Sequence, residues 1–321
     1  PVSPVRPVGP LLAVLIVLAA AVATAAPGPA GDDPSHLQQR LQEHRTQEAA
    51  AKAARLAKWH AAEQRVTANQ LLYDVRHYEL ALDLDPASEQ LTGTVTITAT
   101  VTGASLASLE LDLDQGLTVD GTTCAGTGVA ASHAGDLLTV DLDRTYSDGE
   151  TVVVAVSYHG NPEGSAFGWN YHGGDPVIWT LSEPYGARTW WPCKDTATDK
   201  ADSLDVVVTV PDELIVASQG LVVSDVDNGA TRTTHWHSGY PTATYLVSLA
   251  IHPYTTFSDW YTPQGGGDPM EIQHFVYPDH YGSVQATYAL VPDMIGAFAQ
   301  GFGEYPFVDE KYGHAEFPWG G

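Results

Sequence analysis

Cysteine is scarce in this chain. Only Cys124 and Cys193 occur among its 321 residues, so a fold held together by several disulfides is excluded. The two thiols could form one bridge or stay free in the interior, and the sequence leaves both alternatives open. No C-x-x-C pair or other cysteine-based zinc pattern is present.

Catalytic signatures are missing as well. The sequence has no H-E-x-x-H zinc motif, no G-x-S-x-G nucleophile elbow, no P-loop and no dinucleotide-binding fingerprint. His235 and His237 lie two residues apart on one face of an expected strand and could ligate a metal. No third ligand has a suitable spacing, and Trp236 between them favours ordinary sheet packing. We therefore predict no catalytic residue and no metal ligand in this chain.

Basic residues are few. The chain has 14 Lys and Arg against 39 Asp and Glu, a formal charge of −25. Residues 67–321 hold 34 of the acidic and seven of the basic residues. Such a surface repels phosphate backbones, so we expect no nucleic-acid partner. It attracts cationic or amine-bearing partners at long range, although solubility explains most of these charges.

One long apolar run lies near the first residue. Residues 11–23 (LLAVLIVLAAAVA) follow Arg6 and precede an A-x-A site that ends at Ala25. This pattern predicts a signal peptide over residues 1–25, with cleavage after Ala25. The run is too short for a comfortable membrane span, so we rank a membrane anchor lower. We expect a secreted or periplasmic protein without a stable membrane span after cleavage.

Residues 26–69 predict a linker and a helix. A breaker-rich stretch, PGPAGDDP, comes first. Ser35 and Gln38 then have the spacing of a capping box, and an Ala-rich segment follows up to about residue 66. Its apolar stripe is thin, which indicates a spacer or a helix that packs loosely on the rest of the protein.

From Tyr73 onward the apolar residues alternate with polar ones. This period of two, interrupted by Gly, Pro, Asn and Asp, predicts a β-sandwich or related all-β domain over residues 70–258. The expected strands cover residues 78–84, 91–101, 109–113, 137–142, 151–158, 204–210, 214–218, 231–237 and 244–251.

The pattern changes near residue 259. Residues 270–277 again predict a strand, and residues 281–302 predict an amphipathic helix in which Pro292 marks the N-terminal turn. Residues 314–319 are strand-like and run into Gly320 and Gly321. This mixed pattern indicates a second domain over residues 259–321 that has only begun.

Residues 179–205 interrupt the strands with a segment dense in Trp, Pro and acids. Such a loop on a rigid sheet often has a function, although a purely structural connection is an equal alternative. It contains E-P-x-x-A-R at 183–188 and P-C-x-D at 192–195. These strings resemble the aminopeptidase N family of zinc metallopeptidases, and the similarity extends over residues 73–321.

The resemblance implies a saddle-like β-domain followed by the truncated start of a thermolysin-like α/β catalytic domain. It implies a Zn²⁺-dependent aminopeptidase acting on peptides with a free N-terminus. Glu183 matches the acid of this family that binds the substrate α-amine, whereas Leu181 replaces a Gln found in many members. Gly320 and Gly321 match the start of the strand that binds the substrate backbone.

The same resemblance makes Arg188 and Asp195 a structural pair, and gives Trp190, Trp191 and Cys193 a packing role. The zinc ligands of the family would lie beyond Gly321, so we expect a fragment that is inactive by itself. The alternative is a non-catalytic β-sandwich that binds or adheres to a partner, or a family member that lacks the metal site.

Overall fold

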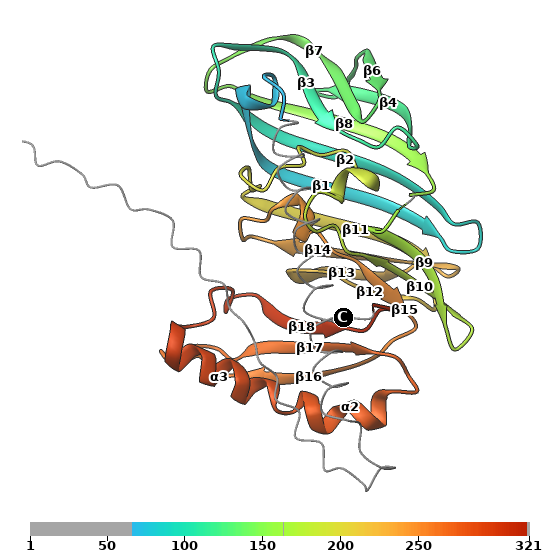
Figure 1. The fold of residues 1–321 in the computed structure, drawn as a ribbon, viewed down its shortest axis with the longest axis vertical. Helices are drawn as coiled ribbons and strands as arrows, with labels where there is room; N and C mark the ends of the chain where they lie inside the picture. Colours follow the sequence, from blue (N-terminus) through green and yellow to red (C-terminus); the bar gives the residue numbers. More distant parts are fainter. Residues whose placement is uncertain (1–65, 163, 320–321) are drawn as a thin grey trace, which may run out of the picture. The chain divides into compact units, whose positions relative to one another are not determined.

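The computed structural model describes residues 66–162 and 164–319. The predicted signal peptide, most of the predicted 26–69 segment, Gly320 and Gly321 lie outside the described residues. The described part is mainly β, as the alternating pattern predicts (Figure 1). None of its helices has the length and apolar character needed to cross a membrane.

The largest sheet has eight strands in the order β13-β14-β11-β1-β2-β8-β4-β5. All neighbours are antiparallel except β1 and β11, which pair in parallel. The strands are β1 (Tyr73–Asp85), β2 (Gln90–Val101), β4 (Thr118–Cys124), β5 (Thr127–Gly128), β8 (Thr151–Gly160), β11 (Ser203–Pro211), β13 (Leu221–Asp227) and β14 (Thr231–Ser238).

Two smaller sheets complete the β-domain. One has the order β3-β7-β6, with β3 (Ser105–Asp112), β6 (Ala131–Ala134) and β7 (Leu137–Ser147). The other has the order β12-β15-β10-β9, with β9 (Phe167–His172), β10 (Asp175–Thr180), β12 (Ile215–Ala217) and β15 (Ala250–His252). Short 3-10 turns are η1 (Gln70–Leu72), η2 (Ala187–Thr189) and η3 (Thr244–Leu246).

One core holds the three sheets together. In β2, β8 and β11 every second residue is buried, and β1 follows the same alternation on either side of a bulge between Val75 and His77, because successive side chains of a strand point to opposite faces. The inward residues are mostly Val, Leu and Ile and form one cluster that also includes Trp190 and Trp191.

A fourth sheet, in the order β16-β17-β18, contains β16 (Thr255–Tyr261), β17 (Met270–Val276) and β18 (Lys311–Ala315). Strands β17 and β18 are parallel. Helices α2 (Tyr281–Tyr288) and α3 (Val291–Phe302) lie in the crossover between them, along one face of the sheet (Figure 1). This is the strand–helix–strand order that the sequence predicts.

Several predicted elements need correction. Residues 244–251 do not form one strand: η3 occupies the first part and only β15 is extended. The single helix expected over 281–302 is two helices, and Pro292 is the second residue of α3. The last strand is β18 and not residues 314–319. Strand β16 also runs across the boundary expected at residue 259.

Both cysteines are free and buried. Burial raises the pKa of the Cys193 thiol well above its ordinary value, so this thiol is protonated and unreactive at neutral pH. The structure therefore decides between the two alternatives that the sequence leaves open, in favour of free thiols.

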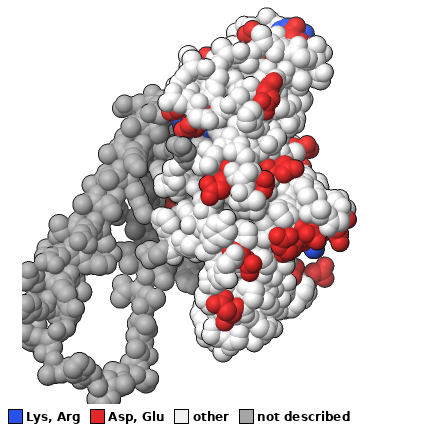
Figure 2. All heavy atoms as spheres, turned by 90° about the vertical axis from the view of Figure 1, so that its right-hand side faces the viewer, with Lys and Arg blue, Asp and Glu red and all other residues white. Residues whose placement is uncertain are grey.

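Acidic side chains dominate the visible surface. Figure 2 shows Asp and Glu spread over the face that it presents, with few Lys and Arg among them. Part of the acidic excess counted in the sequence therefore lies on this face.

Candidate functional site

The segment between β10 and β11 contains Glu183, the predicted amine-binding acid. Thr180 ends β10, and Glu183 follows three residues later with an exposed side chain. Its carboxylate has no hydrogen bond or ion pair to any described residue. An exposed acid without a partner remains available to bind a ligand.

The backbone beside Glu183 is held in place. Ser182 is 1% exposed, and its hydroxyl accepts a hydrogen bond from the indole nitrogen of Trp190 at 2.9 Å. Its carbonyl oxygen accepts another from the amide of Gly186 at 2.7 Å. Trp190 is itself fully buried, so the residue before Glu183 is fixed to the core.

A buried ionic network supports the same loop. The Arg188 guanidinium lies 2.9 Å from a carboxylate oxygen of Asp195 and 3.0 Å from one of Asp112. Asp195 also accepts a hydrogen bond from the Thr244 hydroxyl at 3.0 Å. Burial raises the pKa of Asp112 and Asp195, and the charge of Arg188 opposes this rise. The predicted Arg188–Asp195 pair is confirmed.

Asp112 is a partner that sequence reasoning missed. It lies at the end of β3, far from the loop in sequence, and accepts hydrogen bonds from the Asp195 amide and the Gln70 side chain, both at 2.9 Å. The predicted packing role of Trp190, Trp191 and Cys193 is confirmed, since all three are fully buried.

The last described residues lie against the start of this loop. The Trp179 ring centroid is 5.6 Å from that of Phe317 and 6.2 Å from that of Trp319. Leu181 and Phe317 both pack against the main core. Two segments that the sequence singles out, around residue 183 and just before Gly320, are therefore neighbours.

A pocket of about 450 Å³ opens beside these segments. Its lining includes Thr180, Phe275, Phe317 and Lys311. The Lys311 ammonium donates to the carbonyl of Ser218 at 2.7 Å and lies 4.7 Å from the centre of the Trp236 ring. Burial lowers the pKa of Lys311 to about 8. Apolar and polar residues thus line the pocket together, and Glu310, Lys311 and His314 are among them.

The His235–His237 pair forms a different cluster. His235 Nε2 and His237 Nδ1 lie 2.7 and 2.9 Å from the same oxygen of Asp205, and His77 Nε2 lies 3.2 Å from the other oxygen. Burial disfavours the Asp205 charge, but the hydrogen bonds from His235 and His237 hold its pKa below the ordinary value. Trp236 is buried, as ordinary sheet packing requires.

Asp205 is the partner that the sequence did not reveal. It faces His237 directly across the β11–β14 pair, so strand register brings together residues that are 32 positions apart. One ring nitrogen of each histidine, Nε2 of His235 and Nδ1 of His237, is used in a hydrogen bond to Asp205, and the structural interpretation of the histidine pair agrees with this geometry.

Comparison with known proteins agrees with the resemblance. The model of the Peptidase M1 N-terminal domain matches residues 75–246. Among curated proteins, leukotriene A-4 hydrolase of Xenopus laevis is 24% identical over 196 residues, which are 56% of this chain and 31% of that protein.

Solved structures give the same result at the level of the fold. The M1 zinc metallopeptidase from Deinococcus radiodurans is 27% identical, with a TM-score of 0.67 over 77% of this chain and 57% of that one. A single-residue mutant of that protein bound to a Tyr-Ser-Ala substrate has 27% identity and a TM-score of 0.67, over 78% of this chain and 58% of that one. The chain thus spans less than two thirds of these relatives.

Proposed function

This chain belongs to the M1 peptidase family, and we propose that it supplies the amine-recognising part of an exported zinc aminopeptidase. In this proposal Glu183 accepts hydrogen bonds from the α-ammonium of a peptide substrate, and the enzyme removes the N-terminal residue. Gly320 and Gly321 begin the strand along which the substrate backbone lies, because small residues allow close approach.

The observation that carries the proposal is the state of Glu183. Its carboxylate is exposed and unpaired among the described residues, yet its neighbour Ser182 is fixed by two hydrogen bonds. An exposed acid that binds no ligand would not require a neighbouring residue fixed by two hydrogen bonds. A rigid loop with a free carboxylate is preorganised for a cation, and preorganisation reduces the free-energy cost of binding.

The neighbouring aromatic segment supports the same site. Phe317 and Trp319 lie against Trp179, so the chain that leads to Gly320 comes close to the loop of Glu183. A substrate held by both segments would place its amine at the carboxylate and its backbone along the glycines.

Ligands of the structural neighbours have the chemistry that the proposal needs. Structures of these M1 zinc metallopeptidase mutants hold a Tyr-Ser-Ala substrate, L-tryptophan and L-arginine, each of which has a free α-amine. The acidic surface of this chain adds a long-range attraction for such cations.

Zinc is indicated by the family and not by the residues of this chain. The solved neighbours are zinc metallopeptidases, whereas the sequence printed here has no H-E-x-x-H motif. Its residues therefore do not fit the catalytic zinc of the family. We propose that the ligands lie in a longer protein, after the start of the catalytic domain at residues 259–321, and that residues 1–25 direct export to a secreted or periplasmic location.

The coding sequence tests the enzymatic proposal first. We expect it to continue past Gly321 with M-E-[NH], then H-E-x-x-H and a further Glu within about 25 residues. The longer protein should hydrolyse aminoacyl anilides and lose this activity in a chelator. A stop codon after Gly321, or a degenerate motif, would contradict the proposal and support a non-catalytic binding protein.

A substitution tests the role of Glu183 in that longer protein. Glu183→Gln keeps the shape of the side chain and removes its charge. Since a charge-assisted hydrogen bond contributes about 1.5–3 kcal/mol, kcat/KM for free-amine substrates should fall by about 10- to 150-fold. Glu213→Gln, an exposed acid in the turn between β11 and β12, is the matched control. Equal activity of the two variants would refute the role.

A further inference from the structure

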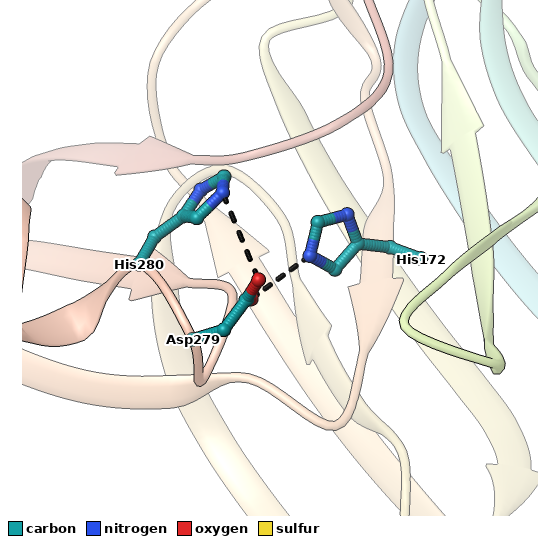
Figure 3. A group of neighbouring side chains, drawn as sticks. All are labelled: His172, Asp279 and His280. Atoms are coloured by element: carbon teal, nitrogen blue, oxygen red, sulfur yellow. Dashed lines mark hydrogen bonds and ion pairs between the residues drawn. The ribbon is translucent and has the colours of Figure 1, made fainter.

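Two histidines and an aspartate converge where the β9–β10 hairpin meets the start of α2. His172 is the last residue of β9, and Asp279 and His280 immediately precede α2. Figure 3 shows the three side chains pointing toward one another from these two elements. His172 Nε2 lies 2.9 Å from Asp279 Oδ1, and His280 Nε2 lies 4.0 Å from Asp279 Oδ2.

Within residues 66–162 and 164–319, this is the group in which three potential ligand atoms from three residues lie within 4.8 Å of one another. The cluster around Asp205 does not meet this condition, although it contains more histidines. The difference is one of distance: the ligand atoms of His172, Asp279 and His280 all lie within 4.8 Å of one another, and those of the Asp205 cluster do not.

A second carboxylate orients His280. The Nδ1 atom of His280 lies 3.1 Å from Glu316, which also accepts a hydrogen bond from the amide of Tyr277 at 2.7 Å. A proton on Nδ1 directed at Glu316 leaves the lone pair on Nε2, the atom that faces Asp279. Metal-bound histidines in proteins almost always have such an outer carboxylate or carbonyl on the other ring nitrogen.

The ring of Tyr277 orients His172. The two rings are stacked with centroids 3.7 Å apart and planes 7° apart, and Tyr277 is buried. Each imidazole is thus fixed by a contact that is separate from Asp279. A simple His172–Asp279 ion pair would need neither the second imidazole nor its carboxylate.

We propose that His172, Asp279 and His280 form a site for a divalent ion of the Zn²⁺ type, with Glu316 as its outer-sphere partner. Imidazole and carboxylate donors together suit Zn²⁺, Co²⁺, Ni²⁺ and Cu²⁺ better than Mg²⁺ or Ca²⁺. Ligands about 2.0–2.1 Å from tetrahedral Zn²⁺ are about 3.3 Å apart, so the observed 2.9 and 4.0 Å lie on either side of that separation.

The ion would join two parts of the chain that are 107 residues apart. It would connect the hairpin of the β9–β10 sheet to the first turn of α2, which covers the β16–β18 sheet. The side chains remain partly exposed, from 28% for His172 to 66% for Asp279, so water can complete the coordination. The role that follows is a structural cross-link.

Isothermal titration of the 321-residue chain with ZnCl₂ tests the site. We expect one ion per chain, and at least a tenfold loss of affinity in each of His172→Gln, Asp279→Asn and His280→Gln. Glu316→Gln should lose about 10- to 100-fold through the outer sphere. Zinc should raise the melting temperature of the parent chain and not that of the three ligand variants, since an ion that binds only the folded state stabilises it.

Matched controls separate this site from other histidines. His159 is exposed and lies 2.8 Å from Asp120 without a second imidazole in the pair, so His159→Gln should bind zinc as the parent does. His235→Gln should also leave binding unchanged. Circular dichroism checks the fold, and Asp279→Asn, at an exposed position, remains decisive if a histidine variant unfolds.

Three results would overturn the proposal. The first is no zinc binding by the folded parent chain. The second is equal affinity in the parent chain and in Asp279→Asn and His280→Gln. The third is loss of binding in His235→Gln with binding retained in His280→Gln, which would place the ion at Asp205.

Discussion

The β-domain and residues 255–319 bury their apolar side chains very differently. The β-domain sheets share one large core. The sheet β16–β18 has a small core of its own, in which Val291 and Ala299 of α3 lie on Met270 and Ile272. Its other face adds Phe275 and Tyr277 to the main core.

The outer side of α3 shows the contrast most clearly. Four apolar residues at every fourth position are about half exposed or more: Leu290, Met294, Phe298 and Phe302. A helix normally buries one apolar stripe, and α3 has two, of which one has no cover among the described residues. Strand β13, at the edge of the largest sheet, also exposes Leu221, Val222, Val223 and Val226. The contrast between the two regions therefore lies in their buried cores, one large and one small.

The largest effect is expected from breaking the buried network of the β-domain. Arg188→Ala leaves Asp112 and Asp195 buried without their counter-ion, which should cost about 3–5 kcal/mol of unfolding free energy. Urea denaturation of the 321-residue chain measures this. The control is Arg232→Ala, whose partner Asp225 is about one third exposed and whose loss should cost about 0–1 kcal/mol. Similar costs for both variants would contradict the account.

Acid should weaken the sheet β16–β18, and also β15, where burial lowers the pKa of His252, before it weakens strand β1. His274 is fully buried, and burial lowers its pKa despite a bond to Asp259. Burial and the adjacent His274 lower the pKa of His314 as well. As the pH falls, these histidines take up protons in the unfolded state before they do so in the folded state. The stability that the neutral, buried histidines give is therefore present above about pH 6.5 and decreases as the pH falls below it.

Hydrogen exchange measured between pH 7 and pH 5 can locate this effect. After correction for intrinsic rates, the amides of β17 should lose protection while those of β1 keep theirs. His274→Phe should reduce the pH dependence, because it keeps a ring and removes the titrating group. Uniform loss of protection in β1 and β17 would show that the two regions respond as one.

The smallest effect on stability is expected on the outer side of α3. The double variant Met294→Gln, Phe298→Gln should change the unfolding free energy by no more than about 0.5 kcal/mol. It should nevertheless reduce the fluorescence of a bound hydrophobic dye. Ile272→Ala, in the buried half of the same region, should cost about 2–5 kcal/mol. A cost above 2 kcal/mol for the double variant would show that the outer row is buried.

Long alternating segments were predictable from the sequence. Strands β1, β2, β8 and β11 follow the period of two closely, because each has one face in the core. Strand β13 was missed. All its residues are exposed, so its sequence does not alternate between apolar and polar residues as that of a half-buried strand does. Pro292 was expected in the N-terminal turn of the helix and lies in the first turn of α3, whereas the separate helix α2 before it was missed.

The candidate site was predictable only where a motif names a residue. Glu183 and the Arg188–Asp195 pair lie within one short segment. The contacts of Asp112 with Asp195, of Asp205 with His237 and of His172 with Asp279 depend on sheet register and chain crossing over 83, 32 and 107 residues. The spacing of residues along the chain cannot predict such contacts, because the fold brings together segments that are far apart in sequence.

The most direct test is a structure of the longer protein with a bound amino acid or short peptide. The account predicts that the α-amine nitrogen lies about 2.7–3.0 Å from the Glu183 carboxylate, beside the segment in which Trp179 contacts Phe317 and Trp319. A ligand whose amine binds other groups, with Glu183 still facing solvent, would contradict the central claim.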